Sequence, residues 1–125
     1  TVLNSNDMMI ETLRGFLEGV LFANELDGFG IVDIPEDDIN DAFSNYIDVF
    51  INMVDVSSSL MEEAENHSFE QLGRDMYFQL AGHGVGLWEQ KETAQLNQLW
   101  QAMIDTKVVT DFEVFIDGEC VCFSM

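Results

Sequence analysis

The longest periodic stretch of the sequence is EDDINDAFSNYIDVFINMVDVSSSLMEEAE, residues 36–65. Its apolar residues recur in steps of three and four, which is the spacing of one face of an α-helix. They are Ile39, Phe43, Tyr46, Ile47, Phe50, Met53, Val54, Leu60 and Met61. The spacing predicts a long helix that ends by Asn66 or His67, with a break at the serines of residues 57–59 left open.

The opposite face of this predicted helix is acidic. Four acids recur at every seventh position, in steps of ~10.5 Å along the helix, and four more stand near its ends. Together they are Asp37, Asp38, Asp41, Asp48, Asp55, Glu62, Glu63 and Glu65. No Lys or Arg falls within the stretch. Because like charges on one helix face repel each other, we infer that the negative field itself serves a function.

The composition is strongly acidic and also rich in apolar residues. The chain has 125 residues with 24 Asp and Glu against 4 Lys and Arg, a formal net charge of -20, and 47% of it is hydrophobic. This favours one folded domain over residues 1–125 rather than a disordered tail. We expect basic protein surfaces as partners and no direct binding of nucleic acid or membrane. General solubility or adaptation to salt is the alternative.

A first helix is predicted to begin after a cap at Asn4 or Ser5. Its buried stripe consists of Met9, Leu13, Phe16, Leu17, Val20 and Leu21. Three further acids recur at every seventh position: Glu11, Glu18 and Glu25. Arg14 is expected to pair with Glu11 or Glu18. Gly15 and Gly19 either weaken the helix or let another element approach closely.

Residues 25–36 lie between the two predicted helices and loosely fit a twelve-residue calcium-binding loop. Gly30 would make the sharp turn and Glu36 the bidentate end ligand, but Phe29 stands where an oxygen ligand is needed. The favoured interpretation is a glycine-rich loop, with or without a short strand at residues 31–34, and no metal or other cofactor. Pro35 then opens the long helix, with acids at the positive end of its dipole.

The second half of the chain, residues 71–125, is predicted to contain two hairpins and one helix. Apolar runs at residues 76–80 and 85–88 are joined by a turn at residues 81–84, since glycine supplies positive φ angles. A helix from about Glu92 to Asp105 follows. It is predicted to bury Leu96, Leu99, Trp100 and Met103.

The second predicted hairpin has strands at residues 108–116 and 119–123 around a two-residue turn at Asp117 and Gly118. One of its faces is predicted to carry Phe112, Val114, Ile116, Val121 and Phe123. The other carries Phe115, Cys120 and Cys122. Cysteines two apart on one strand face are poorly placed to bridge each other. With neither a signal peptide nor a membrane-spanning run in view, a reducing cytosolic setting is expected.

Residues 74–89, RDMYFQLAGHGVGLWE, resemble a module of small uncharacterised tailed-phage proteins. Those proteins read roughly Asp-Phe-Trp-Leu-Thr-Arg-Asn-Gly-His-Gly-x-Gly-Phe-Trp-Asp, followed by a short helix and a closing hairpin. The positions that agree are Gly82, His83, Gly84, Gly86 and Trp88, whereas Leu80 and Ala81 replace the Arg-Asn pair. The resemblance covers residues 74–123 and carries no activity. It implies a phage or mobile-element origin and a counter-defence or host-takeover role.

His83 and the cysteines are the remaining candidates for chemistry. A histidine between glycines can act as a general base, but no nucleophile motif accompanies His83, so a turn residue is favoured. Cys120 and Cys122 with His67 or His83 suggest zinc only weakly, because the spacing of structural sites is missing. Free, buried or half-buried thiols are favoured. We therefore expect a protein that is not an enzyme.

These patterns predict an α+β fold. Two N-terminal acidic helices would occupy residues 1–70. A four-stranded, mostly antiparallel sheet of two hairpins with one intervening helix would occupy residues 71–125.

The predicted function is similar in strategy to that of phage antirestriction proteins that imitate duplex DNA. The expected partner is a basic nucleic-acid-binding protein of a restriction-type or CRISPR-type system in the host cytoplasm. A homodimer would double the available charge. The alternative is a small acidic adaptor that blocks a protein–protein surface through the hairpin. The predicted binding residues are Glu11, Glu18, Glu25, Asp37, Asp38, Asp41, Asp48, Asp55, Glu62, Glu63 and Glu65.

Overall fold

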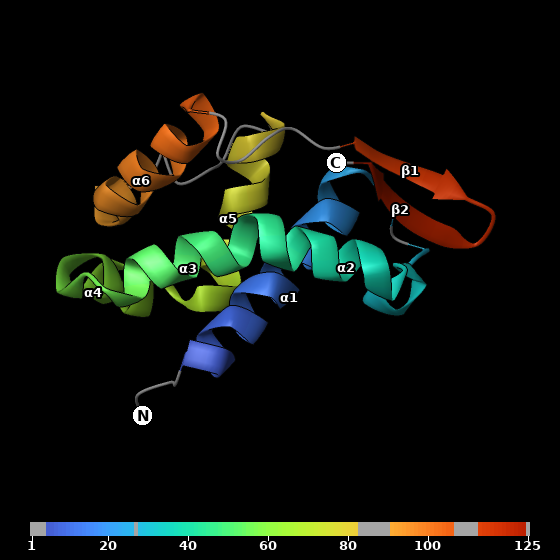
Figure 1. Cartoon of the computed structure of the whole chain (residues 1–125). Coiled ribbons are helices and arrows are strands. Elements are labelled where there is room, and N and C mark those ends of the chain that lie inside the picture. The colour runs from blue at the N-terminus through green and yellow to red at the C-terminus, as the bar shows by residue number, and fades with distance from the viewer. Residues whose placement is uncertain (1–4, 27, 83–90, 107–112, 125) are drawn as a thin grey trace.

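The computed structural model describes residues 5–26, 28–82, 91–106 and 113–124. Figure 1 shows α2 and α3 as one rod across the molecule, crossed by α1, with the hairpin near the α2 end. The elements are α1 (Ser5–Ala23), the 3-10 turn η1 (Ile31–Asp33), α2 (Glu36–Ala42), the π-helical turn η2 (Phe43–Ile47), α3 (Asp48–Asp55), α4 (Ser58–His67), α5 (Phe69–Ala81), the 3-10 turn η4 (Lys91–Thr93), α6 (Ala94–Asp105), β1 (Glu113–Asp117) and β2 (Cys120–Ser124).

The fold is mostly helical, so the prediction of an α+β fold with a four-stranded sheet is wrong. Within the described residues, the sheet consists of the single antiparallel hairpin β1–β2. The strand predicted at residues 76–80 lies inside α5, and Gly82, predicted in a hairpin turn, caps that helix with a φ of 73°. The strand predicted at residues 85–88 and the position of His83 lie outside the described parts of the chain.

The helical period of α5 begins before the run that resembles a strand. Phe69, Leu72 and Met76 are buried at steps of three and four. Ser68 is the N-cap, and its hydroxyl accepts a hydrogen bond from the backbone N–H of Gln71 at 3.4 Å. An apolar run of five residues cannot by itself distinguish a strand from a buried helix. The deciding signal therefore lies upstream of Met76.

The long predicted helix is present but divided at the serines. It runs from Glu36 to Asp55 through η2, and Pro35 precedes its first residue as predicted. Ser57 then caps α4, because its hydroxyl accepts a hydrogen bond from the backbone N–H of Leu60 at 3.4 Å. The predicted apolar face is confirmed at its centre by four buried residues, Tyr46, Ile47, Phe50 and Val54.

Glycines let α1 and α5 cross at close range. A Cβ atom on Gly15 would lie 1.8 Å from the carbonyl oxygen of Glu70, and one on Gly73 would lie 2.0 Å from that of Thr12. Both distances are far below van der Waals contact, so a side chain at either position would force the backbones apart. Of the two interpretations given for Gly15, close approach of another element is confirmed.

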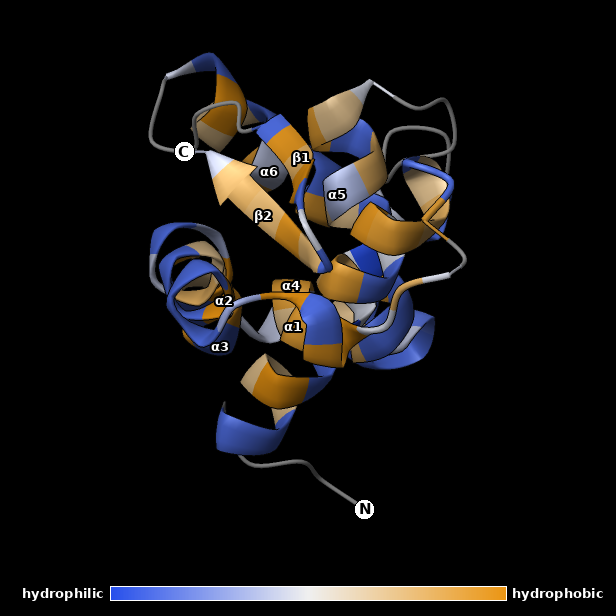
Figure 2. Cartoon of the chain, turned by 90° about the vertical axis from the view of Figure 1, so that its right-hand side faces the viewer, coloured by the Kyte–Doolittle hydropathy of each residue, from blue (hydrophilic) through white to orange (hydrophobic). Residues whose placement is uncertain are grey.

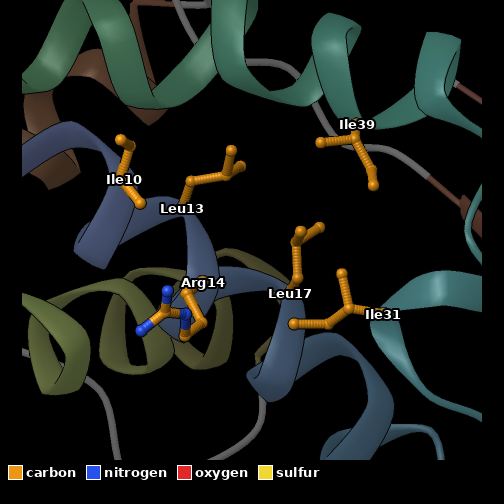
Figure 3. A pocket seen from close by; sticks show the side chains of 6 residues that line it. All are labelled: Ile10, Leu13, Arg14, Leu17, Ile31 and Ile39. Atoms are coloured by element: carbon orange, nitrogen blue, oxygen red, sulfur yellow. The ribbon is translucent and has the colours of Figure 1, made fainter. Parts of the chain in front are cut away.

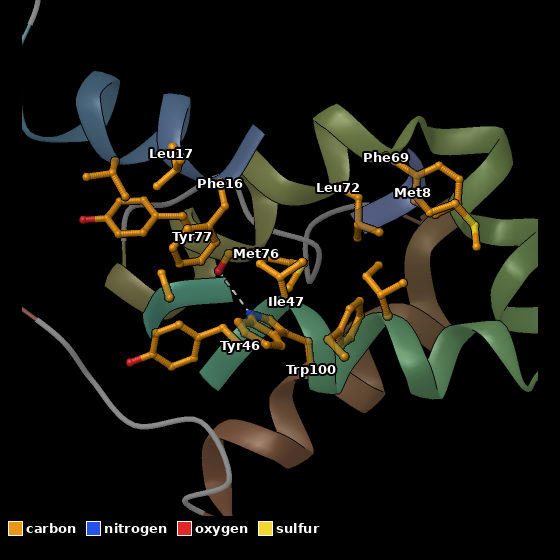
Figure 4. Packing of buried hydrophobic residues seen from close by; sticks show 14 of the residues in the cluster. Met8, Phe16, Leu17, Tyr46, Ile47, Phe69, Leu72, Met76, Tyr77 and Trp100 are labelled. Carbon is orange, nitrogen blue, oxygen red and sulfur yellow. Dashed lines mark hydrogen bonds between the residues drawn. The ribbon is translucent and has the colours of Figure 1, made fainter. Parts of the chain in front are cut away.

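The core is built around aromatic side chains from four helices (Figure 4). Trp100 of α6 is fully buried, lies edge-on to Phe50 with ring centroids 5.3 Å apart, and donates from Nε1 to the carbonyl of Met76 at 3.0 Å. Phe16 of α1 contacts Tyr77 of α5 with centroids 5.4 Å apart. The predicted burial of Leu96, Trp100 and Met103 in α6 is confirmed.

The outer side of the α2–α3 rod is hydrophilic (Figure 2).

The closing hairpin is present with its turn shifted by one residue. Asp117 pairs with Cys120 and Ile116 with Val121, so residues 118–119 form the turn rather than 117–118. This moves the pairing register by two residues, which preserves the faces because side chains alternate with a period of two. Val121 and Phe123 on the predicted inner face are buried.

Candidate acidic interface

The predicted partner-binding acids fall into two groups by exposure. The exposed group comprises Glu25, Asp37, Asp41, Asp55, Glu62 and Glu65. The half-buried group comprises Glu11, Glu18, Asp38, Asp48 and Glu63. All members of the exposed group except Glu25 belong to the segment α2–α4. This segment is therefore the candidate acidic interface.

The π-helical turn η2 changes how the acids line up along the rod. Asp41 precedes this turn and Asp48 comes directly after it. Because a π turn holds about one extra residue, the residues after it are rotated by ~100° relative to a continuous α-helix. Accordingly Asp41 is exposed while Asp48 is half-buried, and Asp48 accepts a hydrogen bond from the side-chain amide of Asn52 at 3.2 Å. The acids therefore spread over the solvent side instead of forming one straight row.

Glu18 takes part in a partly exposed charge cluster between α1 and α5. Its carboxylate accepts a hydrogen bond from Arg74 at 3.3 Å, and Glu70 accepts another from the same guanidinium nitrogen at 3.1 Å. The expectation that Arg14 pairs with Glu11 or Glu18 is wrong. Arg14 is exposed, and it has no ion pair within the parts of the chain that the structure describes.

Glu63 and Asp38 use their carboxylates to join distant elements. Glu63 accepts hydrogen bonds from the backbone N–H groups of Gln95 and Leu96 at 3.0 and 3.1 Å, in the first turn of α6. Asp38 accepts one from the backbone N–H of Phe123 at 3.0 Å, which ties β2 to α2. These two acids, predicted to meet a partner, therefore hold the fold together.

Glu63→Ala should destabilise the protein by about 1 kcal/mol, the usual cost of losing a helix N-cap. The N-cap residue of α6, Thr93, makes no side-chain capping hydrogen bond, so it does not replace Glu63. Urea denaturation followed by circular dichroism measures the change. Glu62→Ala removes the adjacent, exposed carboxylate and should stay within about 0.5 kcal/mol of wild type. Equal effects of the two substitutions would contradict the capping role.

Sequence reasoning missed a buried His–Asp pair. His67 Nε2 lies 2.6 Å from Asp75 Oδ2, and the two side chains are 8% and 1% exposed. Gln71 donates to the other carboxylate oxygen of Asp75 at 3.0 Å. The pair joins the end of α4 to α5 across Ser68, which has a φ of 89°. The helix end at Asn66 or His67 was predicted and is confirmed, but α5 was not predicted, so no sequence signal placed Asp75 beside His67.

The alternative metal sites gain no support. Among the described residues, no group of three or more His, Cys, Asp and Glu is placed to hold a metal ion. Asp33, in the segment that loosely fits a calcium loop, accepts a hydrogen bond from the backbone N–H of Gly30 at 2.8 Å. Residues 31–33 form η1 rather than a strand, and Asp27 lies outside the described residues.

The two cysteines are free, with Cys120 exposed and Cys122 half-buried. Burial raises the pKa of the Cys122 thiol, and Asp38, Cys120 and Asp117 raise it further. Less thiolate is then present at neutral pH, and the thiolate is the reactive form. The arrangement is typical of an unreactive thiol rather than a nucleophile.

No family model matches the chain, and no characterised protein or solved structure is significantly similar to it. The described helices include none that is long and apolar enough to cross a membrane. The residues of the phage-like module are divided between α5 and a part of the chain outside the described ranges. Function is therefore inferred from charge and geometry.

Proposed function

We propose that this protein is a counter-defence protein that imitates the charge of nucleic acid and occupies the DNA-binding surface of a basic host protein. The main support is the charge of -20 together with the acidic side of α2–α4, in a stretch that contains no Lys or Arg. The exposed acids there are Glu36, Asp37, Asp41, Asp55, Glu62 and Glu65. The resemblance of residues 74–123 to tailed-phage proteins adds support for the host context.

The protein would imitate the negative electrostatic field of DNA rather than the positions of its individual phosphates. The α2–α3 rod of residues 36–55 is ~30 Å long at 1.5 Å per residue. Duplex DNA carries one charge per ~1.7 Å, so the exposed carboxylates are far fewer than the phosphates over the same length. The partner's Lys and Arg would still meet carboxylates in place of phosphates, so protein and DNA compete. A homodimer would bring the charge density closer to that of DNA.

Reversing the charge of four exposed acids on α2–α4 should show whether inhibition depends on this interface or only on the net charge of the protein. The variant Asp37→Lys, Asp41→Lys, Asp55→Lys and Glu62→Lys should weaken inhibition on the order of 10–100-fold, since exposed ion pairs contribute ~0.2–1 kcal/mol each. The measurement is displacement of a labelled 30-bp duplex from purified restriction-type and CRISPR-type DNA-binding complexes, by fluorescence anisotropy. Excess unlabelled duplex should release the bound protein.

The matched control reverses four exposed acids elsewhere in the fold: Glu92→Lys, Asp105→Lys, Glu113→Lys and Asp117→Lys. It changes the net charge equally and should retain most of the inhibition. If both variants lose inhibition to the same degree, the α2–α4 interface is not the binding site. If the duplex is not displaced at all by the wild-type protein, the mimic proposal fails.

An adaptor that blocks a protein–protein surface is the second candidate. It is favoured by Phe115 and Ile116 of β1, which are 47% and 45% exposed. An adaptor complex would persist in excess duplex DNA and would weaken on Phe115→Gln. The mimic complex should instead be released by excess duplex DNA and should be unaffected by Phe115→Gln.

A further inference from the structure

An open apolar groove lies between α1, η1 and α2 (Figure 3). It has a volume of about 190 Å³. Ile10, Leu13, Arg14, Leu17, Ile31 and Ile39 line it. Ile10 is 53% exposed, and Val32, the next residue after Ile31, is 94% exposed. Apolar surface is therefore exposed to solvent at this groove.

The size and lining of the groove favour a row of side chains from a bound peptide helix over a small-molecule ligand. Ligand pockets usually enclose ~300–1,000 Å³ and have several convergent polar groups, whereas this groove is smaller and Arg14 is its only charged lining residue. Ile10, Leu13 and Leu17 form a continuous stripe along α1. Grooves of this kind receive the apolar face of an amphipathic helix, with anchors at i, i+3, i+4 and i+7.

Two acids lie one helical turn from residues that line the groove. Asp7 stands three residues before Ile10 and Glu36 stands three residues before Ile39, so each acid neighbours a groove residue on its own helix. Both acids are exposed. A second copy of this chain is a poor occupant of this groove, because with 4 Lys and Arg against 24 Asp and Glu it has few bases to place beside these acids. A helix with Lys and Arg beside its apolar row complements these two acids.

We propose that this groove binds an amphipathic helix of a basic protein partner. Apolar side chains of that helix enter between Ile10 and Ile39, and its flanking Lys or Arg side chains meet Asp7 and Glu36. One carboxylate of the helix meets Arg14, the exposed base for which the described residues supply no ion pair. The inference rests on the proposed function for the basic character of the partner and adds a second, apolar contact.

The test uses a synthetic helical peptide that has Leu at i, i+3, i+4 and i+7, Lys on both flanks and a single Glu. Methyl NMR of the full chain should show shifts of the resonances of the groove residues, Ile10, Leu13, Leu17, Ile31 and Ile39. Ile10→Gln should weaken peptide binding at least fivefold. Phe115→Gln, a matched exposed apolar position on the hairpin, should leave the affinity unchanged.

A second peptide with Gln in place of each Leu keeps the charge and should not shift the groove methyl resonances. The proposal is overturned if the Leu peptide leaves these resonances in place, or if Ile10→Gln and Phe115→Gln have equal effects. Either result would leave the mimic proposal intact, because that proposal is tested by charge reversal on α2–α4. Conversely, if the peptide binds while the protein fails to compete with duplex DNA, that result would contradict the mimic proposal and support the groove as a helix-binding site.

Discussion

Gly73→Ala should destabilise the protein by about 3 kcal/mol, the upper end of the usual cost of overpacking a core. The new Cβ atom would lie 2.0 Å from the Thr12 carbonyl oxygen and 2.7 Å from the Phe16 backbone nitrogen. In an isolated helix the same substitution would stabilise by about 1 kcal/mol, because alanine has the higher helix propensity. The clash outweighs this gain, since backbone atoms of α1 cannot rotate away as a side chain can.

Urea denaturation followed by circular dichroism measures the effect, and Gly30→Ala is the control. Gly30 has a φ of -120°, which suits any residue, and within the described part of the chain a Cβ there would meet the side chain of Val32 at 3.9 Å. This control should stay within about 0.5 kcal/mol of wild type. A Gly73→Ala protein with wild-type stability would show that α1 and α5 do not cross at the described distance.

Periodicity within one segment predicted the parts of the fold that depend on that segment alone. The buried face of residues 46–54, the helix of residues 94–105 and the two faces of the hairpin all follow from local spacing. The same reasoning failed for α5 because the apolar run was read from Met76, after the helical period had begun at Phe69. The π turn η2 was missed because no residue in it departs from an ordinary helical pattern.

Contacts between distant elements carried no local signal. Glu63 reaches the backbone of Gln95, and Asp38 reaches that of Phe123. In the sequence both were indistinguishable from their solvent-exposed neighbours, because an acidic residue type does not indicate whether its carboxylate meets water or a backbone N–H. The candidate interface is therefore narrower than the predicted set, and its exposed members lie mainly on α2–α4.

His67→Ala should destabilise the protein by about 3 kcal/mol, the lower end of the cost of removing one partner from a buried pair. The substitution leaves the carboxylate of Asp75, which is 1% exposed, without the imidazole now 2.6 Å away. The hydrogen bond from Gln71 to Asp75 at 3.0 Å remains and limits the loss. His67→Gln keeps a donor group at this position and should cost less than His67→Ala.

A double-mutant cycle with Asp75→Asn separates the pair from the packing of either side chain. Asp75→Asn replaces the carboxylate by a neutral amide, so the loss of His67 no longer leaves a buried carboxylate without the imidazole. The double variant His67→Ala, Asp75→Asn should therefore be more stable than the sum of the two single effects implies, by on the order of 1 kcal/mol or more. Chemical denaturation of all four proteins at one pH gives this coupling. Strictly additive effects would mean that His67 and Asp75 do not stabilise each other across the α4–α5 turn, and that the cost at each position comes from packing alone.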